Sequence, residues 1–502
     1  MTDQQPPGGV TAAFCKERAL QGASRVRLSK LLRSSMHNVE LTAAQEQSLR
    51  NMESQTSVVV VTGQQIGLLG GPMYAIMKVR TAVEEARRIS IANGVTVVPV
   101  FWLEDNDHDA AEAATTTLLG STGKPETVCV WDGTAERVSN VHRTFDARTI
   151  ESVHNLVLQL SGQFAEHTQQ RLLSTYKEGV SWADAFMEVL QPYLGEWGVV
   201  VLRASEVIAS GLHIPILMKD AKPPGTLAAV IAAETERMQN SGEHVQAKVG
   251  SVVFFGSDEH GRAKLRPELI QVEHMQQHPQ QYTPNVLSRP LVQDAVLPTV
   301  ETVLGGAEMY YHHQIRTAYT YLGIPQPLLV RRNGITIVDP KTQRLLEKDG
   351  HPTEWFFVNT DELEKKLSTE LSADVVPDID EAKRGIETAL APFLRAAEAS
   401  DPTLIATVNA QISGMKTGVD TIASKLRAAA MRKSAAIAER ARNLQAILHP
   451  NGILQERVYP LAFWEARIGI NTLRIIVEHA CSTAAGRHSV VHVSTVMEHT
   501  SP

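Results

Sequence analysis

The sequence predicts an α/β fold: a mostly parallel sheet with helices on both faces, followed by a long helical arm. Apolar runs at 57–61 and 95–103 enclose an amphipathic helical stretch, as in a strand–helix–strand unit. Further strand-like runs recur as far as residue 339. Beyond residue 359 strand signals become rare, and apolar residues recur at heptad spacing.

The first strand–helix–strand unit contains a glycine-rich connection. The run SVVVV is β-branched and continuous, which is typical of a buried parallel strand. The segment TGQQIGLLGGP at 62–72 follows, and Pro72 fits the first turn of the next helix. Asn93-Gly94 marks the end of that helix, before the second strand VTVVPVFWL.

Three later segments have the composition of further strands of this sheet. They are GVVVLRAS at 198–205, SVVFFGSD at 251–258 and PLLVRRNGITIVD at 327–339. Helical stretches separate them, so an open sheet with crossover helices is expected.

The helical arm is predicted over 359–448, between a core over 1–358 and a C-terminal segment over 449–502 that returns to the core. Asp401-Pro402 marks a helix start, and residues 379–399 form the partner of an antiparallel pair. A helical lid packed flat on the sheet domain is the alternative, and an exposed seam would suit a homodimer. The apolar seam steps by four and three through Val408, Ile412, Met415, Val419, Ile422, Leu426 and Ala429.

Composition places the chain among ordinary globular proteins. It has 502 residues, a formal charge of −7 and 21% charged residues, which argues against a nucleic-acid binder. Its three cysteines form no C-x-x-C pair, so neither a zinc site nor a disulfide framework is indicated. The N-terminal stretch lacks the pattern of a signal peptide, and no apolar run is long enough to span a membrane. A cytoplasmic location is therefore expected.

The glycine-rich segment is a candidate phosphate or anion site. A turn between a strand and a helix presents free backbone N–H groups, and glycines let a ligand come close. Gln64 and Gln65 add uncharged donors and acceptors. The spacing matches neither GxGxxG nor the P-loop, so a tight structural turn is the alternative. The glycines concerned are Gly63, Gly67, Gly70 and Gly71.

A second polar cluster, LEDNDHDAAEA, follows the second strand. Ligands bind at the carboxyl ends of the strands of such sheets, so this cluster is expected beside the glutamines. His108, flanked by Asp107 and Asp109, is a candidate general base. A metal site and a solvated loop that caps the next helix are the alternatives.

A third segment, residues 285–315, has polar residues within an apolar run, which is costly unless they find partners. Arg289 is suited to hold a carboxylate, and a structural Arg–Asp bridge is the alternative. The candidate substrate-binding residues here are Asn285, Arg289, Gln293, Asp294, Glu308 and Tyr311.

Together these segments resemble one family, the cysteine-adding enzymes of bacillithiol biosynthesis, BshC. The resemblance covers most of the chain and is less clear over residues 120–250. It rests on five segments in order: VTGQQIGLLGGPMY, PVFWLEDNDHD, LSRPLVQDAVLPTVETVLGGAEMYY, YLGIPQPLLVRR and HPNGILQERV.

The resemblance implies a Rossmann-like core related to nucleotidyltransferases and class I aminoacyl-tRNA synthetases, with a coiled-coil arm that forms a homodimer. It also implies a ligase that joins L-cysteine by an amide bond to the amine of glucosaminyl-malate. The chain departs from the family at Asn106, where an acid is expected and for which Glu104 or Asp105, just upstream, could substitute, and in the alanine-rich stretch AAEAA. These departures leave room for a variant substrate.

Amide formation requires an activated carboxyl, so ATP, with Mg²⁺, is the expected activator, and another activated cysteine donor is the alternative. The HIGH and KMSKS signatures of class I synthetases are absent, and therefore ATP use follows from chemistry and not from a motif. In the catalytic set, His108, held by Asp107 or Asp109, would take the proton of the attacking amine, and Gln64 and Gln65 would orient the nucleotide or the cysteine. Arg289 would hold a carboxylate and Glu308 the cysteine ammonium. No metal-binding residues are predicted.

Two other functions are compatible with the sequence. One is a nucleotidyltransferase-like ligase for a different amine and acid, and the other is a non-catalytic dimeric scaffold of a thiol pathway. Residues 455–457 suggest either a second nucleotide site or a hinge with an Arg–Glu pair.

Overall fold

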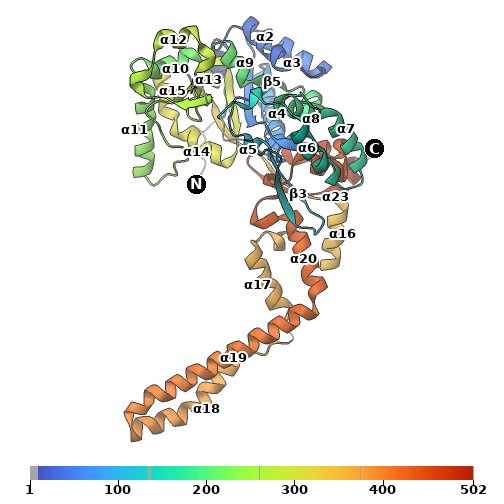
Figure 1. The fold of residues 1–502 in the computed structure, drawn as a ribbon, viewed down its shortest axis with the longest axis vertical. Helices are drawn as coiled ribbons and strands as arrows, with labels where there is room; N and C mark the ends of the chain where they lie inside the picture. Colours follow the sequence, from blue (N-terminus) through green and yellow to red (C-terminus); the bar gives the residue numbers. More distant parts are fainter. Residues whose placement is uncertain (1–8, 134–136, 259–260, 374, 501–502) are drawn as a thin grey trace. The chain divides into compact units, whose positions relative to one another are not determined.

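The computed structural model describes residues 9–133, 137–258, 261–373 and 375–500 (Figure 1). The chain divides into two compact units. The first, the sheet unit, comprises Met1–Gly120, Glu126–Asp339 and Glu456–Pro502. The second, the helical unit, comprises Ser121–Pro125 and Pro340–Gln455.

The sheet unit is built on five parallel strands in the order β10-β9-β1-β2-β5. The order reverses between β1 and β9, which is the arrangement of a Rossmann-like sheet. This confirms the predicted α/β class. The strands are β1 (Val58–Gln65), β2 (Val97–Glu104), β5 (Val200–Arg203), β9 (Thr299–Leu304) and β10 (Leu328–Arg331).

Strand β1 lies at the centre of this sheet because its valines are apolar on both faces. Val58, Val59, Val60 and Val61 are fully buried, as expected for a strand with helices on either side. The register pairs Gln65 with Glu104 of β2. The polar residues that end the two strands are therefore neighbours.

Helices cover both faces of the sheet. Helix α4 (Tyr74–Asn93) packs on β1, β2 and β9, together with α1 (Ala12–Ala19). Helices α2 (Arg25–Ser35), α3 (Ala43–Glu53) and α9 (Ala204–Ala209) pack on β2 and β5. Helix α4 ends at Gly94, which adopts a left-handed conformation, as Asn93-Gly94 predicts. Pro72, predicted in the first turn of α4, instead lies two residues before it.

Two strand predictions are wrong in detail. Strand β6 (Phe254–Asp258) does not join the parallel sheet but pairs antiparallel with β7 (Gly261–Lys264) and β8 (Thr283–Pro284). The segment 327–339 forms two strands, of which β11 (Gly334–Val338) pairs with β12 (His488–His492). Strand β9 was missed, because the alternation of Glu and Thr with Val in TVETVL hides a strand whose six residues are all buried.

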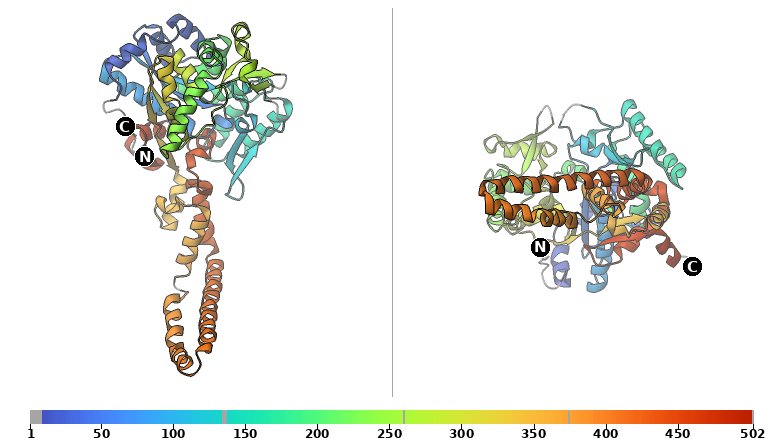
Figure 2. Two further views of the ribbon diagram at one scale, coloured as in Figure 1. Left: turned by 90° about the vertical axis from the view of Figure 1, so that its left-hand side faces the viewer. Right: turned by 90° about the horizontal axis from the view of Figure 1, so that it is seen from below.

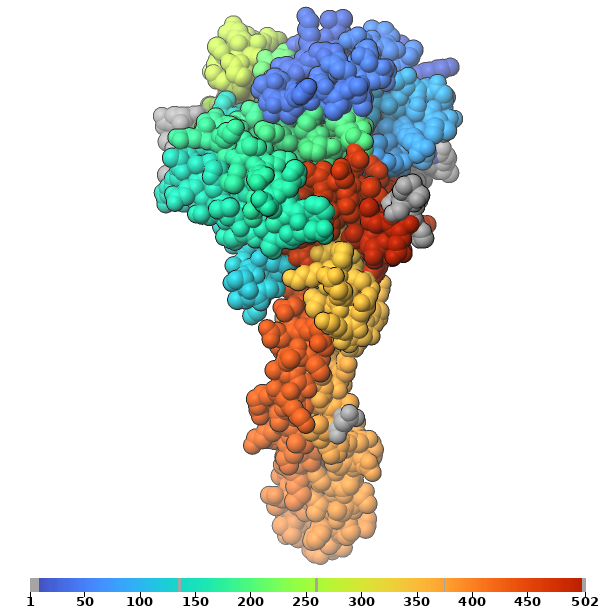
Figure 3. Space-filling view, turned by 90° about the vertical axis from the view of Figure 1, so that its right-hand side faces the viewer, coloured from blue at the N-terminus to red at the C-terminus, as the bar shows by residue number. Residues whose placement is uncertain are grey.

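The C-terminal helices belong to the sheet unit. They are α21 (Leu461–Ile468), α22 (Ile470–Cys481) and α23 (Val493–Thr500). Figure 3 shows the C-terminal part of the chain, in red, beside the green part that contains α6 to α8. Helix α22 packs on α4, and α21 packs on α7. The remaining elements are β3 (Thr115–Leu119), β4 (Pro125–Cys129), α5 (Ala110–Ala113), α6 (Ala147–Gln159), α7 (Ala165–Thr175), α8 (Trp182–Glu196), α10 (Ile214–Ala221), α11 (Thr226–Asn240), α12 (Val272–Gln277), α13 (Arg289–Val296), α14 (Gly306–Gln314) and α15 (Arg316–Leu322).

The helical unit contains α16 (Pro340–Asp349), α17 (Thr360–Leu371), α18 (Ile379–Ser400), α19 (Ile405–Lys433) and α20 (Ala435–Leu448). Helices α18 and α19 lie side by side as an antiparallel hairpin (Figure 2), as predicted.

The connection between α18 and α19 begins where the sequence indicates. Asp401 accepts hydrogen bonds from the backbone N–H of Thr403 at 2.9 Å and from its hydroxyl at 2.7 Å. The predicted seam of α19 is only partly covered, with Met415 48% and Ile422 61% exposed. No helix in the described ranges is long and apolar enough to cross a membrane.

Candidate active site

A cavity of about 650 Å³ lies at the carboxyl ends of β1, β2 and β9, where the strand order reverses. This is the position at which sheets of this kind bind ligands. Its walls come from the ends of these strands, from the first turns of α4 and α14, from α13 and from β6 and β7. All of these elements belong to the sheet unit.

The first part of the glycine-rich segment lines this cavity. Gly63, Gln64 and Gln65 belong to β1 and not to the following turn, so the predicted strand is four residues too short. A Cβ at Gly63 would lie 3.3 Å from the carbonyl oxygen of Trp102. The carboxamide of Gln64 accepts from Lys78 Nζ at 3.0 Å and donates to the Tyr74 hydroxyl at 3.2 Å.

The second part of the segment is packed inside the protein. Gly67, Gly70 and Gly71 are absent from the cavity lining. A Cβ at Gly70 would lie 2.9 Å from Val189 Cγ1 and 3.0 Å from Leu461 Cβ. This placement corrects the prediction that these three glycines hold a cofactor, because neighbouring helices α8 and α21 cover the turn.

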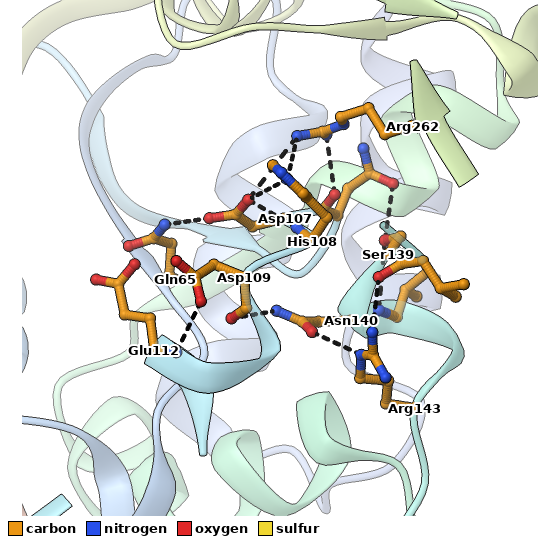
Figure 4. A network of polar contacts seen from close by, with 12 residues as sticks. Gln65, Asp107, His108, Asp109, Glu112, Ser139, Asn140, Arg143 and Arg262 are labelled. Atoms are coloured by element: carbon orange, nitrogen blue, oxygen red, sulfur yellow. Dashed lines mark hydrogen bonds and ion pairs between the residues drawn. The ribbon is translucent and has the colours of Figure 1, made fainter. Parts of the chain in front are cut away.

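His108 lies at the end of β2 with Asp107 beside it (Figure 4). Asp107 Oδ1 accepts from the backbone N–H of His108 at 2.7 Å and lies 3.1 Å from its Nδ1. The Gln65 carboxamide donates to Asp107 Oδ2. Burial tends to raise the pKa of Asp107, but the hydrogen bonds from His108 and Gln65 and the charge of Arg262 outweigh it and lower that pKa. Asp107 therefore stays ionised beside the imidazole.

Arg262, on β7, joins this pair from a strand that the sequence analysis did not predict. Its guanidinium lies 3.8 Å from Asp107 and 3.4 Å from His108 Nδ1, and it donates to the carbonyl oxygen of Asn106 at 2.9 Å. The side chain of Asn106 does not line the cavity, and its Oδ1 accepts a hydrogen bond from the Ser139 hydroxyl at 3.0 Å. Asn106 thus ties the loop after β2 to the segment around Ser139.

Asp109 has a different position from Asp107. Its Oδ1 accepts from the backbone N–H of Glu112 at 2.8 Å, so it is the N-cap of α5. It is exposed and does not contribute to the cavity lining. Of the two acids that flank His108, the structure therefore assigns only Asp107 to the imidazole, and this corrects the catalytic assignment of Asp109.

Four of the six residues predicted in the third segment line the cavity: Asn285, Arg289, Glu308 and Tyr311. Arg289 donates to the Tyr311 hydroxyl at 3.4 Å. Glu308 Oε2 lies 2.6 Å from Lys78 Nζ and accepts from the backbone N–H of Gly305 at 2.6 Å. Asn285 orders the chain before α13 by accepting from the N–H groups of residues 287 and 288.

Gln293 and Asp294 do not line the cavity, which corrects their assignment to substrate binding. Asp294 is fully buried and accepts from the Tyr319 hydroxyl at 2.6 Å and from the Gln293 carboxamide at 3.1 Å. Its backbone oxygen accepts from Arg18 at 2.8 Å. These groups satisfy one another in the core, which is why the polar residues are tolerated there. Gln293 also accepts from Arg289, at 3.2 Å.

Sequence reasoning missed most of the cations that line the cavity. The cations are Lys78, Lys248, Arg262, Lys264, Arg289, Arg332 and Arg457, and the acids are only Glu104, Asp107 and Glu308. Of the lining cations that the sequence analysis did not name, only Lys78 has a local signal, because it interrupts the apolar start of a helix. The excess of cations suits an anionic ligand. In the described part of the chain, no group of three His, Cys, Asp or Glu residues is arranged to hold a metal ion.

Glu104, one of the two acids offered as substitutes for the acid expected at position 106, ends β2 inside the cavity. Trp102 Nε1 donates to its Oε2 at 3.0 Å. Burial raises the pKa of Glu104, although Arg289 and Arg262 oppose this shift.

Residues 455–457, which suggested a second nucleotide site or a hinge, have three different environments. Glu456 is buried, 2.6 Å from Arg332 Nη2, and accepts from the N–H of Ile335 at 2.7 Å, so its arginine partner is Arg332 and not the neighbouring Arg457. Gln455 donates to the carbonyl oxygen of Ile447 within the helical unit. Arg457 lines the main cavity instead, 5.8 Å from the centroid of the Tyr74 ring.

Comparison with known proteins agrees with this architecture. Residues 11–333 match the N-terminal Rossmann-like domain of bacillithiol biosynthesis BshC, and residues 335–493 match its C-terminal coiled-coil domain.

Relatives named "Putative cysteine ligase BshC" align over most of the chain. The protein of Chlorobaculum tepidum is 28% identical, over 86% of this chain and 82% of its own. That of Koribacter versatilis is 27% identical, over 96% and 92%, and that of Geobacillus kaustophilus is 24% identical, over 96% and 93%. Since the two domain matches together span almost the whole sequence, the chain belongs to the bacillithiol biosynthesis BshC family.

Proposed function

We propose that this protein is the cysteine ligase of bacillithiol biosynthesis and joins L-cysteine to the amine of glucosaminyl-malate through an activated carboxyl group. Its relatives carry the name of a cysteine ligase. The observation that carries the proposal is the pair of His108 and Asp107 in a cation-lined cavity at the reversal of strand order.

His108 is suited to act as the general base. When Nδ1–H donates to Asp107, Nε2 is left as the acceptor, and the imidazole is 39% exposed and lines the cavity. An amine attacks a carbonyl carbon only in its neutral form and loses a proton as the C–N bond forms. His108 Nε2 would accept that proton, and the ionised Asp107 would stabilise the imidazolium.

The cations of the cavity suit the acidic substrate. Glucosaminyl-malate carries two carboxylates, and a planar guanidinium binds a carboxylate with two parallel hydrogen bonds. Arg289, at the first turn of α13, is the proposed carboxylate ligand. Glu308 is the proposed contact for the cysteine ammonium through Oε1, since Oε2 already contacts Lys78 and Gly305.

The activator proposed is ATP with Mg²⁺, which would convert the cysteine carboxylate into a reactive acyl group. Phosphates would fit the exposed cations of the cavity, such as Lys248 and Arg457, better than the covered glycine turn. A cytoplasmic location and a homodimer formed through the α18–α19 arm complete the proposal.

The test is mass spectrometry of a thiol-labelled reaction. Purified protein would be incubated with glucosaminyl-malate, L-cysteine, ATP and Mg²⁺, and ATP would be omitted from a parallel sample. Product that forms only with ATP supports the ligase reaction and ATP as its activator. Product that forms without ATP contradicts ATP as the activator.

Other amines and acids form a second arm of this experiment. Turnover of another pair alone would establish a ligase of different specificity. Binding of the substrates by folded protein without turnover would favour the scaffold.

A further inference from the structure

Lys78 is a buried cation at the centre of the candidate site. It lies one turn into α4, and its side chain is only 3% exposed. Its neighbours Ala75, Ile76, Met77 and Val79 are also buried, in a helix that packs on the sheet. A lysine at such a position is costly unless its charge and its three N–H groups find partners.

The ammonium group of Lys78 has three close acceptors. Nζ lies 2.9 Å from the carbonyl oxygen of Gly63, 3.0 Å from Gln64 Oε1 and 2.6 Å from Glu308 Oε2. An ammonium group has three donors, so all of them are used. Lys78 has no N–H left for a ligand, although it lies in the wall of the cavity.

These acceptors come from both sides of the reversal in strand order. Gly63 and Gln64 end β1, whereas Glu308 belongs to α14, which follows β9. Because Lys78 takes the carboxamide oxygen of Gln64, the amide nitrogen is directed to the Tyr74 hydroxyl. The end of β1 and the start of α14 are thus joined through one side chain.

The contact with Glu308 extends to the rest of that wall. Oε2 of Glu308 also accepts from the N–H of Gly305, and the Tyr311 hydroxyl lies 3.5 Å from Oε1. Tyr311 in turn accepts from Arg289. If Lys78 were removed, a carboxylate would remain in the wall without its counter-ion, and Gln64 would lose its orientation.

We propose that Lys78 is a positioning residue: it joins the end of β1 to the start of α14 and so holds Gln64 and Glu308 in place for the substrates without binding them itself. The expected effect of Lys78 on kcat rests on the proposed function, whereas its expected effect on the order of the cavity wall does not.

Lys248 is the matched control, because it lines the same cavity from the segment between α11 and β6. It is exposed, and its ammonium group forms no ion pair within the described residues. A lysine of this kind is free to contact an anionic ligand. The replacements Lys78→Met and Lys248→Met therefore remove the same charge from the same cavity but different contacts.

The first measurement is hydrogen–deuterium exchange of the full-length protein without ligand. Lys78→Met should increase exchange at least threefold at residues 63–65 and 305–308, and Lys248→Met should leave both segments unchanged. Unchanged exchange in Lys78→Met would overturn the proposal even if no substrate were ever found. The double variant Lys78→Met/Glu308→Gln, which leaves no unpaired carboxylate, repeats the test if the single variant does not fold.

The second measurement is steady-state kinetics with the substrates of the ligase reaction. Lys78→Met should lower kcat about 100-fold, because Gln64 and Glu308 would no longer be held in place for the substrates. Lys78→Arg should restore part of the lost kcat. Lys248→Met should mainly raise KM. A rise in KM alone for Lys78→Met would show that Lys78 binds substrate and would overturn the proposal. An inactive wild type would contradict the proposed function and leave the exchange result to decide the role of Lys78.

Discussion

The two halves of the segment TGQQIGLLGGP have different environments, although the sequence presents them as one glycine-rich turn. Gly63, Gln64 and Gln65 end a strand and line the cavity. Gly67, Gly70 and Gly71 lie under α8 and α21, and a Cβ at Gly70 would collide with both helices. Glycines near a site can therefore serve backbone conformation and packing alone. Substitutions in the first half of the segment and around the cavity should therefore reduce activity, whereas substitutions in the second half should reduce stability.

The largest expected effect is at His108, which shares the cavity with the first half. His108→Asn should lower kcat about 1000-fold without changing the free energy of unfolding, because it removes the proposed base. The pH profile of kcat/KM checks this, since the variant should lose the dependence that the imidazole gives to the wild type. A wild-type rate at neutral pH would exclude His108 as the base.

The second largest expected effect is a loss of stability when Gly70 is replaced. Gly70→Ala should lower the free energy of unfolding by about 3 kcal/mol, because its φ is +83° and Val189 and Leu461 leave no room for a Cβ. Gly94→Ala is the control: its φ is +63° but no atom lies within 4 Å, so only about 1 kcal/mol should be lost. Denaturant unfolding followed by tryptophan fluorescence measures both. If Gly70→Ala were fully stable but inactive, the turn would belong to the site after all.

The two acids beside His108 provide a matched pair. Asp107→Asn should lower kcat about 100-fold, because an amide cannot stabilise the imidazolium as a carboxylate does. Asp109→Asn should change activity less than twofold, since asparagine is an equally good N-cap of α5. Equal losses in the two variants, measured under the same conditions, would mean that both acids act on the imidazole.

The lowered pKa of Asp107 adds a pH test. The folded protein keeps Asp107 ionised at a pH where the unfolded chain binds a proton. The stability due to this carboxylate is therefore complete above its ordinary pKa, about 3.9, and is lost as the pH falls towards the lowered value. The free energy of unfolding of Asp107→Asn should therefore be lower than that of the wild type at neutral pH, and this difference should shrink at acidic pH. Unfolding curves at several pH values measure it.

The smallest effect concerns a buried acid in the middle of β9. Burial, and then the charge of Glu85, raise the pKa of Glu301 well above its ordinary value, while Arg88 opposes this shift at 3.1 Å. The folded protein keeps this proton where the unfolded chain has lost it, so the stability falls as the pH rises from about 4.3 towards the raised pKa.

Replacing Glu301 tests the predicted loss of stability with rising pH. Glu301→Gln should be about 1 kcal/mol more stable than the wild type at pH 8, and this gain should shrink at pH 5. Glu46→Gln, which breaks an exposed pair with Arg33, should instead lower stability slightly at pH 8. A gain for Glu301→Gln that did not depend on pH would show that the charge of Glu301 is not its cause.

The sequence alone determined the features that depend on local pattern. Continuous β-branched runs are buried on both faces of a parallel sheet, and this fact located β1, β2 and β5. Heptad spacing and the Asp401-Pro402 signal located the hairpin of α18 and α19. The rule that ligands bind at the carboxyl ends of strands brought Gln64, Gln65 and His108 to one edge.

Only the tertiary structure decided which polar residues of the candidate segments face the cavity. Asp107 and Asp109 are two residues apart, yet one contacts the imidazole and the other caps a helix. Arg262 reaches the site from a strand with no local signature of binding, and the only local sign of Lys78 is a charge in the apolar start of a helix. A side chain's role depends on contacts between segments far apart in the chain, and the periodicity of a single segment contains no information about those contacts.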